Sequence, residues 1–334
     1  VSYLQESIDQ SKSQYGFGYR LFGSTWTTLN LTTPDILRQR MSFNLSQIMV
    51  LSGNTMMIFQ RTDAHPLSAY YDMLQSHSFG NYYNLLYDVS LSPQMGHFLS
   101  HYNNPKADPA NNIHPDENFA REIMQLFSIG LWQLNKDGSR RRDAQGQLIP
   151  SYDNQDIKEM AEVFTGLGPN IPGGQFGNIF PQTNENWVKP MRMYEAFHDT
   201  SDKILLNNTI LPAGQSGMDD ISQTIEMLST HDNTAHFICQ QLIQKFTTSN
   251  PSPQYISDVV DVFDPFEEGN FKELIKAILL HPEARNCDIT EHYSFGKLRE
   301  PIVRMMNWLR AFPMSTKQNG DYFNFLRCPI YTIG

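Results

Sequence analysis

The clearest structural signal in the chain is the stretch PDENFAREIMQLFSIG at residues 115–130. Its apolar residues recur at steps of three and four, as they do on one face of an α-helix. Gly130 follows the last apolar residue, and glycine is the residue that most often ends a helix. We therefore predict a helix from Asp116 to Ile129 and, from similar patterns on both sides of it, a mainly α-helical protein.

Glu122 lies inside the apolar face of this predicted helix. At about 100° per residue it falls between Leu126 and Ile129. A carboxylate among apolar side chains is costly unless it is paired or protonated. Two interpretations stay open: a structural one, in which Glu122 pairs with an arginine or caps a neighbouring helix, and a functional one, in which it is a catalytic or ligand-binding acid. Glu117 and Arg121, four residues apart on the opposite flank, predict an ordinary helical ion pair.

Helical patterns fill both ends of the chain, whereas the middle differs. The middle, at residues 131–215, is predicted to hold a hairpin and long loops: Asp137-Gly138 predicts a β-hairpin turn, and residues 168–215 are rich in Gly, Pro and Asn. We expect an N-terminal helical part at 1–130 and a C-terminal helical part at 216–334, all around one continuous core. Both ends are abrupt, which favours a fragment of a longer chain. Further helices are expected near residues 33–51, 66–74, 80–91, 92–102, 154–164, 219–229, 234–247, 253–262, 270–280 and 293–312.

The composition narrows the class of protein. Of the 334 residues 40% are hydrophobic and 12% aromatic, which indicates a packed core and argues against general disorder. The formal net charge of −10 argues against nucleic-acid binding. The sequence contains no run of about 18 apolar residues, so we predict no membrane span. The charged fraction of 18% favours an exported protein. Cys239, Cys287 and Cys328 form no Cys-x-x-Cys pair, which excludes zinc-ribbon and thioredoxin-type sites and leaves their disulfide state open.

A second acidic helix and a histidine-containing loop supply further polar candidates. Asp156 stands in the first turn of that helix, where an acid caps and stabilises the helix end, and Glu159 follows it. His198 and Asp199, followed by Lys203, lie in the loop-rich middle, where a functional site is expected. Asp199 could orient a nearby imidazole; the alternative is an ordinary surface pair.

These motifs resemble the signature of a bacterial family known as domain of unknown function 1800. The family pattern pairs the helix of residues 115–130 with a downstream Tyr-x-x-x-Asp, an acidic helix and a Thr-Gly pair. The further matches, in family order, are Tyr152, Asp156, Glu159, Thr165-Gly166, His198-Asp199, Lys203 and residues 211–215, 241–243, 249–251, 280–285 and 297–301. Leu167-Gly168 departs from the pattern, which usually has an aromatic residue after Thr-Gly. The resemblance covers nearly the whole chain.

The resemblance implies a bacterial protein exported to the periplasm, the cell surface or the medium. It supplies no accepted reaction, so no catalytic role is carried over to any residue. It does direct attention to the ionisable positions within or beside the matched motifs, which are Glu117, Arg121, Glu122, Asp156, Glu159, His198, Asp199 and Lys203.

We expect Glu122, Asp156 and the His198-Asp199 pair to converge in one polar cleft as catalytic residues. Such a site would perform acid/base chemistry or hold a divalent metal, in a hydrolytic or envelope-polymer-modifying protein. The alternative is a non-catalytic scaffold or binding protein of the cell envelope, in which the same acids belong to a buried ion-pair network. A glycan or an envelope protein is the expected partner in both cases. The supporting residues, as substrate contacts or structural ion pairs, are Glu117, Arg121, Glu159 and Lys203.

Overall fold

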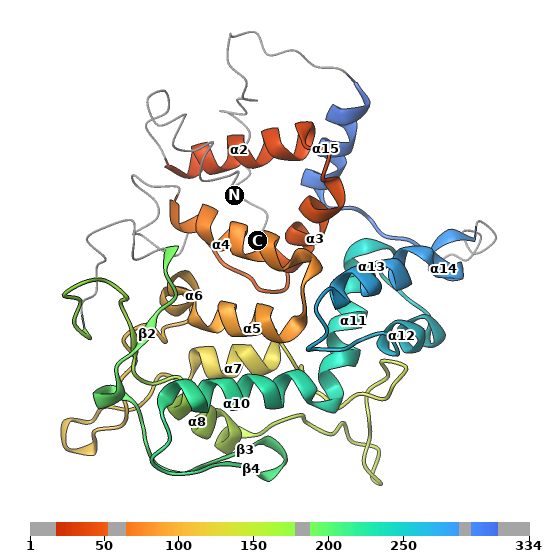
Figure 1. Cartoon of the computed structure of the whole chain (residues 1–334). Coiled ribbons are helices and arrows are strands. Elements are labelled where there is room, and N and C mark those ends of the chain that lie inside the picture. The colour runs from red at the N-terminus through yellow and green to blue at the C-terminus, as the bar shows by residue number, and fades with distance from the viewer. Residues whose placement is uncertain (1–17, 53–64, 178–187, 287–294, 313–334) are drawn as a thin grey trace.

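The computed structural model describes residues 18–52, 65–177, 188–286 and 295–312, and within them the fold is mainly α-helical, as the sequence predicts (Figure 1). The α-helices are α2 (Gly18–Thr32), α3 (Ile36–Ser46), α4 (His65–Ser76), α5 (Tyr82–Leu91), α6 (Pro93–Phe98), α7 (Asn118–Gln125), α8 (Asn154–Val163), α10 (Gly217–Thr230), α11 (Asp232–Phe246), α12 (Pro253–Val260), α13 (Asn270–Leu280), α14 (Pro282–Arg285) and α15 (Pro301–Ala311). Two antiparallel pairs of short strands join β1 (Leu167–Gly168) to β2 (Arg192–Met193) and β3 (Lys203–Leu205) to β4 (Thr209–Leu211).

The helix of the signature stretch is shorter than its sequence pattern predicts. It covers Asn118–Gln125 instead of Asp116–Ile129. Phe127 N donates to Glu122 O, five residues back, so the chain leaves regular α-helical geometry at this point. Leu126, the last residue before this change and one that we predicted on the apolar face, is 37% exposed.

Other differences concern helix ends and one helix that the sequence did not predict. α15 begins at Pro301 instead of near residue 293, because proline fits the first turn of a helix and not its interior. α6 ends at Phe98, before Ser100 adopts a left-handed backbone with φ of 65°. α2 has no counterpart among the predicted helices.

The predicted turn at Asp137-Gly138 is present at the tip of a bridged loop. Gly138 has a φ of 77°, and Leu134 and Arg140 form an antiparallel bridge on either side of the turn. A second turn follows at residues 143–146. The bridges in this segment are isolated, so the pairing does not extend into regular strands.

Side-chain caps fix where α8 and α10 begin. Asp153 accepts hydrogen bonds from the backbone N–H groups of Gln155 and Asp156, and Asp156 Oδ2 accepts one from Asp153 N at 2.7 Å. This reciprocal capping box starts α8. Ser216 accepts from Asp219 N and starts α10 in the same way.

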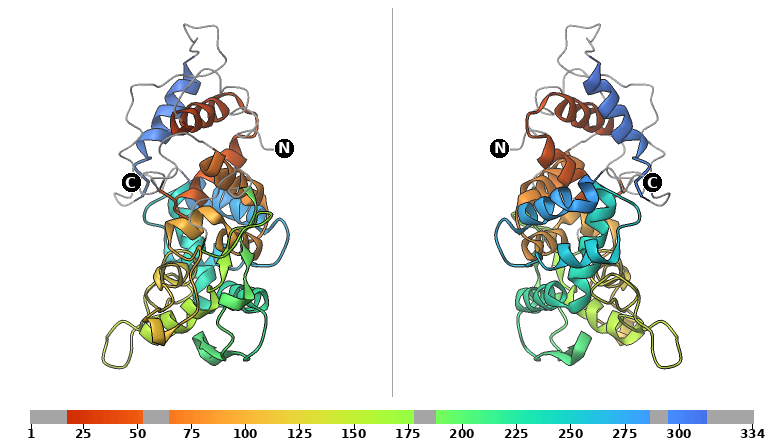
Figure 2. Two further views of the ribbon diagram at one scale, coloured as in Figure 1. Left: turned by 90° about the vertical axis from the view of Figure 1, so that its left-hand side faces the viewer. Right: turned by 90° about the vertical axis from the view of Figure 1, so that its right-hand side faces the viewer.

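Buried apolar side chains from α3 to α13 form one contiguous core. At one end of the molecule α8 lies beside α7 and the β3–β4 pair, and α10 crosses close to them (Figure 1). At the opposite end α2 and α15 pack against each other, as both views of Figure 2 show. There Ile302, Met306 and Leu309 form a second, small cluster with Trp26 and Phe43. Within the described ranges no helix combines the length and the apolar character that crossing a membrane requires.

Candidate functional site

A buried ion network joins the loop after β2 to the first turn of α10. Asp220 Oδ2 lies 2.9 Å from Lys203 Nζ and 3.1 Å from His198 Nε2. Gln215 Nε2 donates to Asp220 Oδ1 at 2.6 Å. The side chains of Lys203 and His198 are fully buried, and that of Asp220 is 2% exposed. Burial opposes the ionisation of Asp220, but the hydrogen bonds from His198 and Lys203 outweigh it and lower its pKa.

The Lys203 ammonium uses each of its three donors within this network. Besides Asp220 it donates to the backbone oxygens of Asp199, at 2.8 Å, and Ser201, at 3.1 Å. A buried ammonium is tolerated only when it is paired and hydrogen-bonded. Lys203 is also the first residue of β3, so these bonds fix the loop of residues 198–203 against that strand.

His198 has an acceptor beside each of its ring nitrogens. Nδ1 lies 3.1 Å from Thr165 O, and Nε2 faces the Asp220 carboxylate. The Thr165 hydroxyl donates to Glu162 O at 2.7 Å, which leaves the Thr165 carbonyl as the acceptor for Nδ1. An imidazolium, with a proton on each nitrogen, satisfies both acceptors. Both ring nitrogens of His198 therefore lie within reach of a hydrogen-bond partner, and Lys203 and His198 both contact the Asp220 carboxylate.

Two glycines allow the backbone to approach this histidine closely. Gly166 has a φ of +84°, and a Cβ there would lie 3.0 Å from His198 N and from Tyr194 O. At Gly217, the first residue of α10, a Cβ would lie 3.0 Å from His198 Cγ and 2.5 Å from Met193 Cε. The Thr-Gly motif therefore has a physical reason. Thr165 hydrogen-bonds to the loop that contains His198, and Gly166 leaves room for the backbone of that loop.

Replacing Gly166 by alanine should destabilise the fold more than the same change at Gly146. Both glycines have a left-handed φ, of +84° and +81°, so an alanine at either position adds the same backbone strain of about 1 kcal/mol. Gly146 has open space around its missing Cβ, whereas Gly166 meets backbone atoms that cannot move aside. We expect Gly166→Ala to lower the free energy of unfolding by about 1–3 kcal/mol more than Gly146→Ala, measured by urea unfolding. Equal losses would contradict the close approach.

Two neighbouring carboxyl groups beside the network have pKa values shifted in opposite directions. Burial, with the nearby charges of Asp199 and Glu159, raises the pKa of Glu162 to about 7. Burial acts in the same direction on Asp199, but the hydrogen bonds from Ser201 and the charge of Lys203 prevail and lower its pKa. Glu162 is half-buried, and its carboxyl accepts no hydrogen bond within the described part of the chain. Near pH 7 the site therefore holds one carboxyl that is about half protonated beside one that is ionised.

The remaining predicted ion-pair residues take structural positions. Glu159 Oε2 accepts from Ile204 N at 3.0 Å and its Oε1 accepts from Gln155 Nε2 at 2.8 Å, so Glu159 fastens α8 to β3. Glu117 and Arg121 form the predicted pair four residues apart, at 3.5 Å, with both side chains about 40% exposed. A pair so exposed contributes little to stability.

Glu122 and Asp156 lie apart from the network. Burial raises the pKa of Glu122 against the opposing charge of Arg121. Its Oε2 is buried and has no hydrogen-bond partner within the described ranges. Burial also raises the pKa of Asp156, whose carboxylate completes the capping box of α8. In the part of the chain that the structure describes, no hydrogen bond or ion pair links either acid to His198.

Sequence reasoning missed three members of the site. Asp220 was not singled out, because an acid at a helix start is well explained by the helix dipole alone and no local pattern indicates its bond to Lys203. Gln215 was likewise given no role, because no local pattern indicates its bond to Asp220. Glu162 was placed further round its helix, away from the apolar stripe, and given no role. Only its position relative to Asp199, 37 residues on, distinguishes it.

Metal and thiol chemistry have few candidates in the described ranges. There, no group of three or more histidine, cysteine, aspartate or glutamate side chains is placed to hold a metal ion, and the expected divalent metal stays a prediction. Cys239 is a free, fully buried thiol, and burial raises its pKa. Cys287 and Cys328 lie outside the described residues.

Comparison with known proteins identifies a family but no activity. The chain matches the family model described as "Protein of unknown function (DUF1800)" over residues 4–330. No curated protein and no solved structure matches it. The match extends over nearly all of the 334 residues and confirms the resemblance carried by the motifs. The chain therefore belongs to the DUF1800 family.

Proposed function

We propose that this protein is an exported hydrolase of envelope polymers and that Glu162 and Asp199 form its acid/base pair. The observation that carries the proposal is the split between the two carboxyls: the pKa of Glu162 is raised to about 7, and that of Asp199 is lowered. Paired acids with divided pKa values are the arrangement in which one group donates a proton while the other accepts one. Export rests on the low charge content and on what the family resemblance implies.

Asp199 is held in place through its backbone N–H, its carbonyl and one carboxylate oxygen, Oδ1. Its backbone N–H donates to Thr165 Oγ1 at 2.9 Å, and its carbonyl accepts from Lys203. Its Oδ1 accepts from both the backbone N–H and the hydroxyl of Ser201, at 2.8 and 2.5 Å. The side chain is nevertheless 17% exposed. In this proposal the buried ions are positioning residues, and the accessible carboxyls perform the chemistry.

The chemistry proposed for the pair is the hydrolysis of a glycosidic or similar bond. Protonated Glu162 gives its proton to the leaving oxygen, and ionised Asp199 takes a proton from the attacking water. A sugar polymer is favoured by an aromatic platform two residues before Asp199. There Phe197 is 40% exposed and stacks on Phe176 at 4.1 Å, with Tyr194 beside Phe176 at 5.7 Å. Aromatic side chains with a few polar groups are typical walls of ligand sites.

The proposal is tested by an assay for released reducing ends on purified bacterial envelope polysaccharides and peptidoglycan. We expect the wild-type chain to cleave at least one of these polymers, and Asp199→Asn to lose about 10²–10⁴-fold in rate. Asp202→Asn is the matched control, because Asp202 is exposed and lies in the same loop without a recorded partner. No cleavage by the wild type, or equal activity in all three proteins, would contradict the proposal.

A second candidate function, a non-catalytic envelope scaffold, is favoured by one observation. His198, Lys203 and Asp220 are all but fully buried, and their polar atoms bond to one another and to the backbone, so none of the three can touch a substrate. Such a network fixes loops in place whether or not a reaction follows. A protein that retains full binding of an envelope partner when Asp199 is changed to asparagine, and that cleaves no polymer, would support this alternative.

A further inference from the structure

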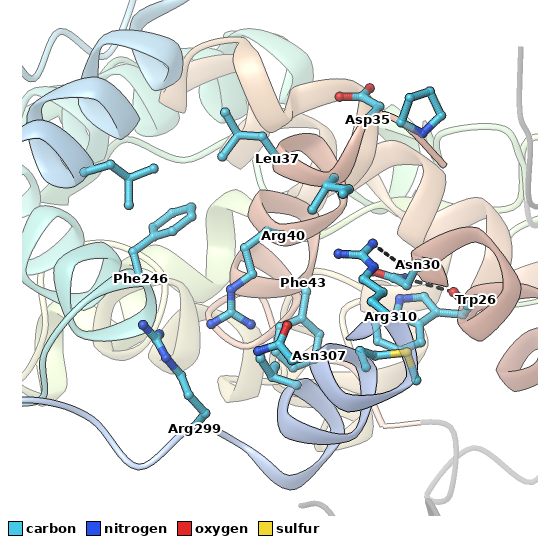
Figure 3. A pocket seen from close by; sticks show the side chains of 15 residues that line it. Trp26, Asn30, Asp35, Leu37, Arg40, Phe43, Phe246, Arg299, Asn307 and Arg310 are labelled. Carbon is cyan, nitrogen blue, oxygen red and sulfur yellow. Dashed lines mark hydrogen bonds between the residues drawn. The ribbon is translucent and has the colours of Figure 1, made fainter. Parts of the chain in front are cut away.

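A hollow lies at the end of the molecule opposite the Glu162 site. It occupies about 630 Å³ between α2, α3, the ends of α11 and α13, and α15 with the residue Arg299 before it (Figure 3). Cavities of this volume are typical of small-molecule sites. Neither the acid/base pair nor the buried ion network contributes a residue to it.

Cations outnumber carboxylates along one wall of this hollow. Arg40 and Arg299 both donate to the same backbone oxygen, that of Lys245, at 3.0 and 3.3 Å. Glu300 is the carboxylate of this group, and it is already bound by Lys297 at 2.7 Å and lies 3.9 Å from Arg40. With Lys245 and Lys297, four cations surround Glu300, although these two lysines and Glu300 lie behind the lining. The carboxylate that does line the hollow, Asp35, is paired with Arg38 at 2.7 Å. Burial lowers the pKa of Arg40 and of Lys245, and cation repulsion adds to it: from Arg299 at Arg40, and from Lys297 at Lys245.

Toward the described residues, these arginines use little of their hydrogen-bonding capacity. A guanidinium has five N–H donors, and within the described ranges Arg40 and Arg299 donate one hydrogen bond each. Figure 3 shows both side chains directed toward one another in the hollow. Arg310, on the other side, donates to Asn30 O, but its buried Nε has no partner within the described ranges. Unpaired donors and surplus positive charge together are what a bound oxyanion would satisfy.

Aromatic rings form part of the remaining lining, which also contains the polar side chains of Asn30, Asp35 and Asn307. The rings of Trp26 and Phe43 lie 5.9 Å apart, and the Arg40 guanidinium lies over the Phe43 ring at 5.4 Å. Phe246 lines the hollow beside Arg299 (Figure 3). A ligand that fits this wall has an apolar, preferably aromatic, body.

We propose that this hollow binds a small organic oxyanion, in which Arg40 and Arg299 hold a carboxylate or phosphate group and Trp26 and Phe43 pack against an aromatic body. The site is separate from the proposed catalytic pair and does not depend on it. Arg299 is the residue to test, because it is less deeply involved in helix packing than Arg40, which extends from α3.

Isothermal titration of the full chain with phenyl phosphate, benzoate and neutral benzyl alcohol tests the proposal. We expect phenyl phosphate or benzoate to bind at one site with an affinity that falls as salt is added, and benzyl alcohol not to bind. The stronger of the two anions identifies the head group. Arg299→Gln should weaken binding about tenfold. Arg304→Gln, which removes a charge from the exposed face of α15, should leave it unchanged.

The proposal is overturned if neither anion binds, if benzyl alcohol binds equally well, or if the two arginine variants behave alike. These binding measurements need no catalytic assay, so their outcome does not depend on whether the protein cleaves a polymer. Loss of activity in the Asp199→Asn variant with undiminished anion binding would support the independence of the two sites.

Discussion

Replacing Lys203 by methionine should lower the free energy of unfolding by about 3–5 kcal/mol, the cost of breaking a buried ion pair by removing one partner. Methionine keeps most of the length and apolar volume of the side chain. It leaves the Asp220 carboxylate without its ammonium, and it removes the donor for the carbonyls of Asp199 and Ser201. Equilibrium unfolding in urea, followed by circular dichroism, measures the loss.

Lys158→Met is the control for that experiment. Lys158 is exposed on α8 and makes no side-chain hydrogen bond or ion pair with the described residues, so its replacement should change stability by less than about 0.5 kcal/mol. If the two methionine variants lose similar, small amounts, the network around Asp220 does not hold the loop of residues 198–203 as described.

Replacing Glu162 by glutamine should abolish the proposed hydrolysis, with a loss of about 10²–10⁴-fold in rate, because the amide cannot donate the proton that the leaving group needs. The wild-type rate should fall above about pH 7, where Glu162 ionises, and again at low pH, where Asp199 takes up a proton. The expected maximum therefore lies in mildly acidic solution. Glu226→Gln, an exposed change on α10, should leave rate and pH profile unaltered.

The stability of the Glu162→Gln variant should change in the opposite direction from its activity. The pKa of Glu162 is raised in the folded chain, so the folded state holds a proton that the unfolded state releases between about pH 4.5 and 7. Wild-type stability accordingly falls as the pH rises through that window. Glutamine removes this penalty, and above pH 7 the variant should be more stable by at most about 1 kcal/mol, because solvent screens a half-exposed carboxyl. An inactive variant that is also destabilised would indicate a structural role instead.

Periodicity and capping predict most of this fold, and they fail where hydrogen bonds leave the regular pattern. α11 and α13 lie within two residues of their predicted ranges, because their apolar faces repeat without interruption. The end of α7 does not, because the bonds from Phe127 N to Glu122 O and from Ile129 N to Met124 O span five residues and end the regular four-residue pattern. A helical wheel assumes constant rotation, so it placed Leu126 among buried residues.

The site could be predicted in part, and the missing part is non-local. His198, Asp199 and Lys203 stand within six positions of one another, so one motif brings them to attention. Asp220 lies 17 residues beyond Lys203, and Glu162 lies on an earlier helix. Their roles come from distances and burial that the folded chain creates, and no spacing rule in the sequence encodes these.

The most direct test of the proposed acid/base pair is the titration of the Glu162 side chain itself. In protein labelled with ¹³C-glutamate, the carboxyl resonance that disappears in Glu162→Gln is assigned to this residue, and its chemical shift is followed from pH 3 to pH 9. The account predicts a midpoint near 7. A midpoint at or below the ordinary value of 4.5 for glutamate would show that the pKa of Glu162 is not raised, and would contradict the proposed acid/base pair.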